Sequence, residues 1–193
     1  MTTKTIGFAL CGSFCTFDIA IKTLEELKTN GYNIIPIMSF NAFNTDTRFG
    51  KAVDFRNKIE NICKNEIIST IPDAEPIGPK KLLDILLIEP CTGNTLAKLA
   101  AGIADTPVTL AVKSQLRNSR PVLISISTND ALSGAAKNIG KLQNYKNIYF
   151  VPYRQDDYKN KPASIISDFS KTLSAVEFAL KGEQLQPILL DFK

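Results

Sequence analysis

Short apolar runs rich in β-branched residues alternate along this chain with segments of helical periodicity. Most of the runs are continuously apolar, which is typical of strands that are covered on both faces of a parallel sheet. They therefore predict the strands of such a sheet. The runs are TIGFAL (5–10), NIIPIM (33–38), LDILLI (83–88), PVLISI (121–126) and NIYFV (147–151).

Apolar residues recur at helical spacing between and after these runs. In 16–29, for example, Phe17, Ile21 and Leu24 share one face, and Asn30-Gly31 provides a stop. Strand and helix alternate, which predicts an α/β fold with a doubly wound parallel sheet, a flavodoxin-like or Rossmann-like three-layer sandwich. Ligands of such sheets bind at the carboxyl ends of the strands, so we expect function in those loops. The other predicted helices are 49–64, 94–104, 130–143 and 164–181.

The composition of the chain excludes several classes of function. A chain of 193 residues with 44% hydrophobic content suits a single domain, 1–193. Its net charge of +4 is scattered, so nucleic acid is not implied. The first apolar run is too short for a membrane span and no signal peptide precedes it, so we expect a cytoplasmic protein with free thiols. The chain has no histidine, which excludes His-dependent triads and imidazole metal sites, and no metal site is predicted.

The loop after the first strand, Leu10 to Thr16, contains the turn Gly12-Ser13. Backbone N–H groups at a helix N-terminus attract anions, glycine permits close approach, and a serine hydroxyl adds a hydrogen bond to phosphate. The alternative is that Ser13 or Thr16 only caps the helix. The loop has neither the GxGxxG nor the GxxxxGK[ST] pattern, so a mononucleotide suits it better than NAD or ATP.

The loops after the later strands are polar as well. Arg48 follows the second strand and is a candidate partner for a carboxylate or phosphate, although an ordinary loop is the plainer interpretation. The hydroxyl and amide groups of 92–95 suit a ribityl chain, or else Thr92 or Asn94 caps a helix. Asp130, Asp156 and Asp157 are candidate bases at two further strand ends, or else solvated turn residues.

Two of these segments carry a resemblance. The Gly-Ser strand end together with Pro90 to Asp105 (PCTGNTLAKLAAGIAD) is similar to the superfamily of homo-oligomeric flavin-containing cysteine decarboxylases, which includes flavin prenyltransferases. Within it, NTDTRFG (44–50), RNSRP (117–121), ISTNDAL (126–132) and QLQPIL (184–189) resemble the dipicolinate synthase B subunits. The likeness covers almost the whole chain.

The resemblance implies a cofactor and partners. It implies FMN, with the phosphate at Gly12, Ser13 and Ser39 and the flavin side at Thr92, Gly93, Asn94 and Thr95, followed by Lys113. That family works with a Rossmann-type A subunit to make pyridine-2,6-dicarboxylate from a dihydrodipicolinate-level precursor during sporulation. We therefore expect an oxidoreductase subunit that is not active alone, in a homo-oligomer such as a trimer or dodecamer, with no membrane partner.

This chain differs from the decarboxylases of that superfamily at two motifs. The decarboxylases carry a histidine after the second strand and a Pro-x-Met-Asn-x-x-Met clamp, whereas this chain reads Ser127 to Leu132 (STNDAL) at the clamp. Peptidyl-cysteine decarboxylation is therefore not expected. For a dianionic substrate the cationic candidates are Arg48, Lys113, Arg117 and Arg120, with Asp130, Asp156 or Asp157 as base. The alternatives are an FMN-dependent decarboxylase or prenyltransferase, and a non-catalytic scaffold that binds only phosphate and supports the A subunit.

Overall fold

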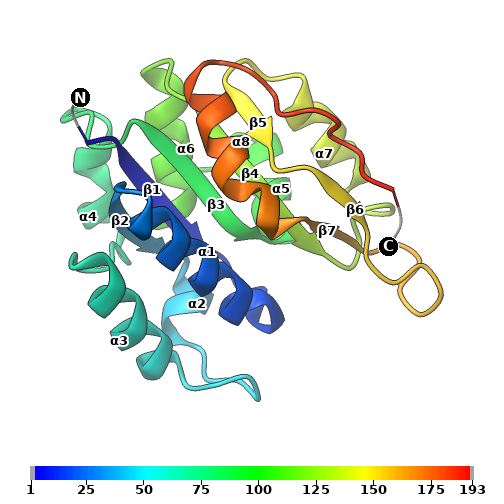
Figure 1. The fold of residues 1–193 in the computed structure, drawn as a ribbon, viewed down its shortest axis with the longest axis horizontal. Helices are drawn as coiled ribbons and strands as arrows, with labels where there is room; N and C mark the ends of the chain where they lie inside the picture. The colour runs from blue at the N-terminus through cyan, green and yellow to red at the C-terminus, as the bar shows by residue number, and fades with distance from the viewer. Residues whose placement is uncertain (1–2, 192–193) are drawn as a thin grey trace.

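The computed structural model describes residues 3–191 and places a seven-stranded sheet between two layers of helices (Figure 1). Five strands run parallel in the order β2-β1-β3-β4-β5, which is the flavodoxin-like order. The predicted doubly wound α/β fold is thus confirmed. The strands are β1 (Thr5–Leu10), β2 (Asn33–Met38), β3 (Ile85–Cys91), β4 (Val122–Thr128), β5 (Ile148–Phe150), β6 (Tyr153–Gln155) and β7 (Ile165–Ser167).

Two hydrophobic cores hold the helices against the two faces of this sheet. Apolar side chains of α1 (Phe17–Thr29), α3 (Ala52–Cys63) and α8 (Thr172–Leu180) pack on one face. Those of α4 (Ile71–Ala74), α5 (Gly93–Ala100), α6 (Pro107–Arg117) and α7 (Ala136–Gln143) pack on the other. Because both faces are covered, the central strands are buried along most of their length and their sequences are largely apolar.

Most predicted elements are present with shifted ends. The strands predicted at 5–10 and 33–38 are confirmed, whereas β3 and β4 continue to Cys91 and Thr128. The helix predicted at 130–143 begins only at Ala136, because the preceding residues form turns on the Asp130 carbonyl. Helix α6 was not predicted, although Thr106 caps it in a capping box with Pro107 as its first residue.

The helix predicted at 164–181 is wrong in its first part. Ile165–Ser167 form β7, which pairs antiparallel with Ser127 and Thr128 at the end of β4 and with β6. This pairing supplies backbone partners where β4 extends beyond its contact with β5, and a local periodicity does not report such a partner. Asp168 then accepts a hydrogen bond from the Ser170 N–H, and α8 begins at Thr172.

Two of the outer strands, β2 and β6, are bordered by segments of the same chain. Ile68 exchanges backbone hydrogen bonds with Pro36 and Met38 of β2 at 2.9 Å. On the other side, the segment around Ile188 lies along β6, where the Tyr153 N–H donates to the Ile188 carbonyl. A strand added by another chain would have to displace these segments.

All four cysteines are free, as predicted, and Cys15 is the one that is exposed. Among residues 3–191 none of the helices is both long and apolar enough to cross a membrane.

One acidic side chain is buried within β3. Glu89 is 0% exposed, and its Oε2 accepts a hydrogen bond from Thr172 Oγ1 at 2.7 Å. Its Oε1 has no hydrogen-bond partner among the described residues. Burial raises the pKa of Glu89 from its ordinary value near 4.5 to about 7, although the hydrogen bond from Thr172 opposes the rise. Glu89 therefore holds a proton in the folded chain well above the pH at which it ionises when unfolded.

Replacing this carboxyl should change how stability depends on pH. The folded pKa lies above the unfolded one, so Glu89 lowers stability as the pH rises from about 4.5 through about 7, by up to about 3 kcal/mol. We expect Glu89→Gln to gain stability relative to the wild type over this window. Urea unfolding at pH 5 and pH 8 measures it, with Glu25→Gln on the exposed side of α1 as control. A pH-independent difference would show that Glu89 is ionised in the fold.

Candidate functional site

The strand order creates a crevice beside β1. Because β1 lies between β2 and β3, the chain leaves β1 toward the face of α1 and leaves β3 toward the face of α5. The loops after these two strands therefore diverge, and ligands of open α/β sheets bind at such a switch point. A hydrogen bond from the Cys11 N–H to the Pro90 carbonyl, at 3.1 Å, ties the two loops together.

Ser13 lies at this crevice and does not cap a helix. Neither Ser13 nor Thr16 makes a side-chain capping hydrogen bond to the helical turns that follow. The Ser13 hydroxyl instead lies 2.8 Å from the Ser127 hydroxyl at the end of β4. The capping alternative for this loop is therefore wrong, and Ser13 is positioned by the sheet, facing the crevice.

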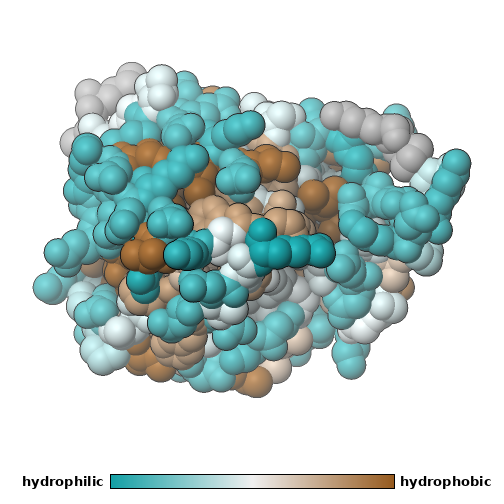
Figure 2. Space-filling view, turned by 90° about the horizontal axis from the view of Figure 1, so that it is seen from below, coloured by the Kyte–Doolittle hydropathy of each residue, from teal (hydrophilic) through white to brown (hydrophobic). Residues whose placement is uncertain are grey.

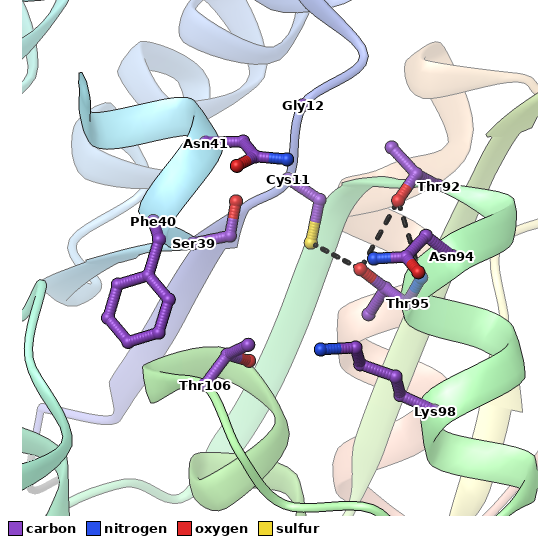
Figure 3. Close-up of a pocket in the computed structure, with 10 residues that line it drawn as sticks. All are labelled: Cys11, Gly12, Ser39, Phe40, Asn41, Thr92, Asn94, Thr95, Lys98 and Thr106. Carbon is purple, nitrogen blue, oxygen red and sulfur yellow. Dashed lines mark hydrogen bonds between the residues drawn. The ribbon is translucent and has the colours of Figure 1, made fainter. Parts of the chain in front are cut away.

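A cavity of about 330 Å³ opens between the ends of β1, β2 and β3 (Figure 3). Ser39, Phe40 and Asn41 stand on one side, while Thr92, Asn94, Thr95 and Lys98 stand on the other, with Cys11 and Gly12 between them (Figure 3). The predicted cofactor residues Gly12, Ser39, Thr92, Asn94 and Thr95 thus meet in one place. Phe40 is 41% exposed at its rim.

Three helix N-termini converge on this cavity. Ser39 caps α2 (Phe40–Asn44), Thr92 caps α5 and Thr106 caps α6, each accepting a hydrogen bond from a backbone N–H of its helix. The remaining N–H groups of these first turns carry partial positive charge, which favours an anion. Lys98 adds a full charge, although both oxygens of Asp105 hold its Nζ at 2.8 Å.

The thiols beside the cavity are neutral. Cys11 Sγ accepts a hydrogen bond from Thr95 Oγ1 at 3.2 Å. Burial nevertheless raises the pKa of Cys11 to about 11, and it raises the pKa of Cys91 well above the ordinary value. A thiolate nucleophile is therefore not available from either residue at neutral pH.

A second cavity, of about 230 Å³, adjoins the first across Gly12 and Thr92. It brings Ser13 together with Asp156 and Lys161, which come from the loop between β6 and β7. Lys161 Nζ lies 3.3 Å from Asp156 Oδ2, and the side chains are 52% and 33% exposed. The other residues that line it are Cys15, Thr16, Ser127, Thr128, Asn129, Ser164, Ile165 and Ile166.

Gly93 lets the end of β4 approach the start of α5. A Cβ at position 93 would lie 2.6 Å from Asp130 Oδ1 and 2.8 Å from Thr128 Oγ1. These two atoms are themselves hydrogen-bonded at 2.5 Å. Gly93 thus permits this close contact, and Asp130 lies beside the predicted flavin segment. Asp157, by contrast, accepts three hydrogen bonds from Lys159 and Asn160 and holds a turn.

The predicted cations lie elsewhere in the described chain. Arg48 is exposed in a turn and lies over the Phe49 ring at 4.9 Å. Lys113 is exposed on α6 and lines an apolar groove that includes Leu99 and Tyr145. Arg120 donates to the Leu83 carbonyl before β3, far along the strand from its carboxyl end. Within residues 3–191, none of these side chains lines either cavity of its own subunit.

The sequence analysis missed both lysines that line the cavities. Lys98 follows Asn94 by one helical turn on α5, so the i, i+4 spacing gave a signal for it. Lys161 had no such signal, because only the pairing of β7 with β4 brings its loop to the crevice. Thr106 was missed together with α6, the helix that it caps.

The chain is similar to several known proteins. The profile described as Flavoprotein matches residues 1–174. The dipicolinate synthase B subunit from Bacillus subtilis (strain 168) is 44% identical over 188 residues, covering 97% of this chain and 94% of that one. The crystal structure of the dipicolinate synthase B subunit from Bacillus halodurans C has a TM-score of 0.90 at 39% identity, covering 98% and 97%. The FMN-dependent cysteine decarboxylase SpaF, with TM-score 0.66, 23% identity and coverage of 93% and 96%, supports the fold alone.

The contact at Gly93 is open to a direct test. We expect Gly93→Ala to lower the free energy of unfolding by about 0.5 to 1.5 kcal/mol, because the new methyl group displaces the oxygens of Asp130 and Thr128 and breaks the hydrogen bond between them. Gly140→Ala in α7 is the matched control, since a Cβ there meets nothing within 4 Å and alanine favours a helix. Urea denaturation measures both. Equal stability of the two variants would contradict the close approach.

Proposed function

We propose that this chain binds FMN and serves the synthesis of pyridine-2,6-dicarboxylate. The reason is that it belongs to the flavoprotein family and, within it, to the family of dipicolinate synthase B subunits. The observation that supports this most is Ser13, a hydroxyl that caps no helix and stands at the switch point between the two cavities. The 193 residues act as one flavoprotein-type domain, since the described strands all join one sheet.

The chemistry of the crevice fits FMN. Gly12, Ser13 and Ser39 would hold the phosphate, since the helix N-termini around them favour an anion. Thr92, Asn94 and Thr95 offer hydroxyl and amide groups to the ribityl chain and the flavin edge, beside Gly93. Bound there, FMN supplies a two-electron acceptor for hydride.

The chain supplies the groups that surround the substrate. Conversion of a dihydropyridine dicarboxylate to the aromatic product releases a hydride and a proton. Asp156 and Asp130 are our candidates for accepting the proton, because Asp156 lines the second cavity and Asp130 adjoins Gly93. Arg48 and Lys113 stay predictions for the site, and a contribution from either requires a neighbouring copy of the chain or a movement of its segment.

The proposal includes partners. An A subunit completes the enzyme, and this chain is not active alone. Large hydrophobic side chains remain exposed from α2 to α3, with Phe40 at 41%, Phe49 at 45% and Val53 at 42% exposure. Figure 2, seen from the side on which α2 and α3 lie in Figure 1, shows separate hydrophobic patches among hydrophilic side chains. These patches support a homo-oligomer, such as a trimer or dodecamer, that covers them.

Loss of the Ser13 hydroxyl should weaken FMN binding. A hydrogen bond to a charged phosphate contributes about 1.5 to 3 kcal/mol, so we expect Ser13→Ala to raise the Kd for FMN at least about tenfold. Ser174→Ala is the control, because Ser174 is exposed on α8 and lines neither cavity. Quenching of FMN fluorescence measures the Kd. Identical affinities in the two variants would remove Ser13 from the site.

Reconstitution tests the activity itself. With the purified A subunit, a dihydrodipicolinate-level substrate and FMN, we expect formation of pyridine-2,6-dicarboxylate, followed by its ultraviolet absorbance, and none with this chain alone. Asp156→Asn should reduce the rate while FMN remains bound. Carbon dioxide release from another substrate would instead favour a decarboxylase. A colourless chain that does not bind added FMN and yet activates the A subunit would favour the non-catalytic scaffold.

A further inference from the structure

The two cavities differ in how their cations are held. Among the described residues that line them, the cationic side chains are Lys98 and Lys161. Lys98 is held by both carboxylate oxygens of Asp105 at 2.8 Å and is 25% exposed. Lys161 has one carboxylate contact, with Asp156 at 3.3 Å, and is 52% exposed. Lys161 is therefore the cation of the crevice that can change partner more easily.

The backbone around Lys161 is well fixed. Its N–H donates to the Asp157 carbonyl at 2.7 Å, and its own carbonyl accepts from the Ser164 N–H at 2.9 Å. The Asp156 N–H donates to the Ser164 carbonyl at 3.0 Å, next to the pairing of β6 with β7. These hydrogen bonds connect the loop to the sheet, so the lysine extends over the cavity from a defined position.

The wall opposite Lys161 suits a carboxylate. Uncharged groups line it, including the hydroxyls of Ser127 and Thr128 and the amide of Asn129. Asp156 Oδ2 already shows the interaction, since it contacts Lys161 Nζ at 3.3 Å and accepts from Ser164 Oγ at 3.3 Å. A ligand carboxylate that enters the cavity can take over both contacts.

We propose that Lys161 binds one carboxylate of the dicarboxylate substrate and exchanges Asp156 for it when the substrate enters. This inference rests on the proposed function and deepens it, because it assigns the substrate to the second cavity and its charge recognition to a residue of the same chain. Asp156 holds the ammonium group over the cavity until the substrate enters and is then released beside it. Lys161 is thus a specificity-determining residue.

The test compares a charged ligand with its neutral isostere. Calorimetry on the FMN-loaded chain with its A subunit gives the Kd of pyridine-2,6-dicarboxylate and of pyridine-2,6-dicarboxamide. A hydrogen bond between charged groups contributes about 1.5 to 3 kcal/mol. We therefore expect Lys161→Gln to weaken the dicarboxylate about tenfold or more and to leave the dicarboxamide unchanged. Lys161→Arg should restore most of the affinity, and Asp156→Asn should strengthen dicarboxylate binding severalfold.

The control is Lys159→Gln, on the same loop, because Lys159 is exposed and lies outside the lining of the cavity. Equal dicarboxylate affinity in the Lys161→Gln and Lys159→Gln variants would overturn the inference. So would an equal loss for both ligands, since that would indicate a structural role of the loop. FMN titration of the wild-type complex separates this inference from the proposed function. A complex that binds FMN and the dicarboxylate retains the proposed function even if the Lys161 variants contradict the inference. A complex that binds neither ligand overturns both the inference and the proposed function.

Discussion

The position of β1 in the sheet determines where this molecule can bind a ligand. Because β1 has parallel neighbours on both sides, the chain after β1 and the chain after β3 must cover opposite faces. Their loops separate at the carboxyl ends of the strands, where the backbone N–H groups of new helices point outward. The crevice, the convergence of helix N-termini and the position of Ser13 all follow from this one arrangement.

Much of the fold could be predicted because burial on both faces leaves a mark in the sequence. Continuous apolar runs located β1 and β2, and the ends of such runs located Gly12, Ser39 and Thr92. What could not be predicted depends on partners distant in sequence. Ile165 and Ile166 have a pattern compatible with a helix, and only the free end of β4 makes them a strand. That same pairing brings Lys161 and Asp156 to the crevice.

The sequence leaves helix capping and a place in the ligand site as alternatives for these residues, and the structure shows that one residue can both cap a helix and line the cavity. Ser39 and Thr92 each accept one backbone hydrogen bond from their own helix and still line the cavity. A cap satisfies one N–H of the first turn and leaves others directed at the crevice. Capping by these residues is therefore compatible with the proposed anion site, whereas Ser13, whose side chain caps no helix, keeps its hydroxyl beside Ser127.

The side chains that line the crevice limit what the protein itself can contribute to a reaction. The chain has no histidine, and burial keeps the thiols of Cys11 and Cys91 protonated at neutral pH. The groups that remain at the two cavities are hydroxyls, amides, the lysines, the carboxylate of Asp156 and the exposed thiol of Cys15. Such groups can bind an anion, orient it and accept a proton, but they accept no electrons. A redox function for this site therefore requires that the electrons pass to a bound cofactor or to a partner subunit.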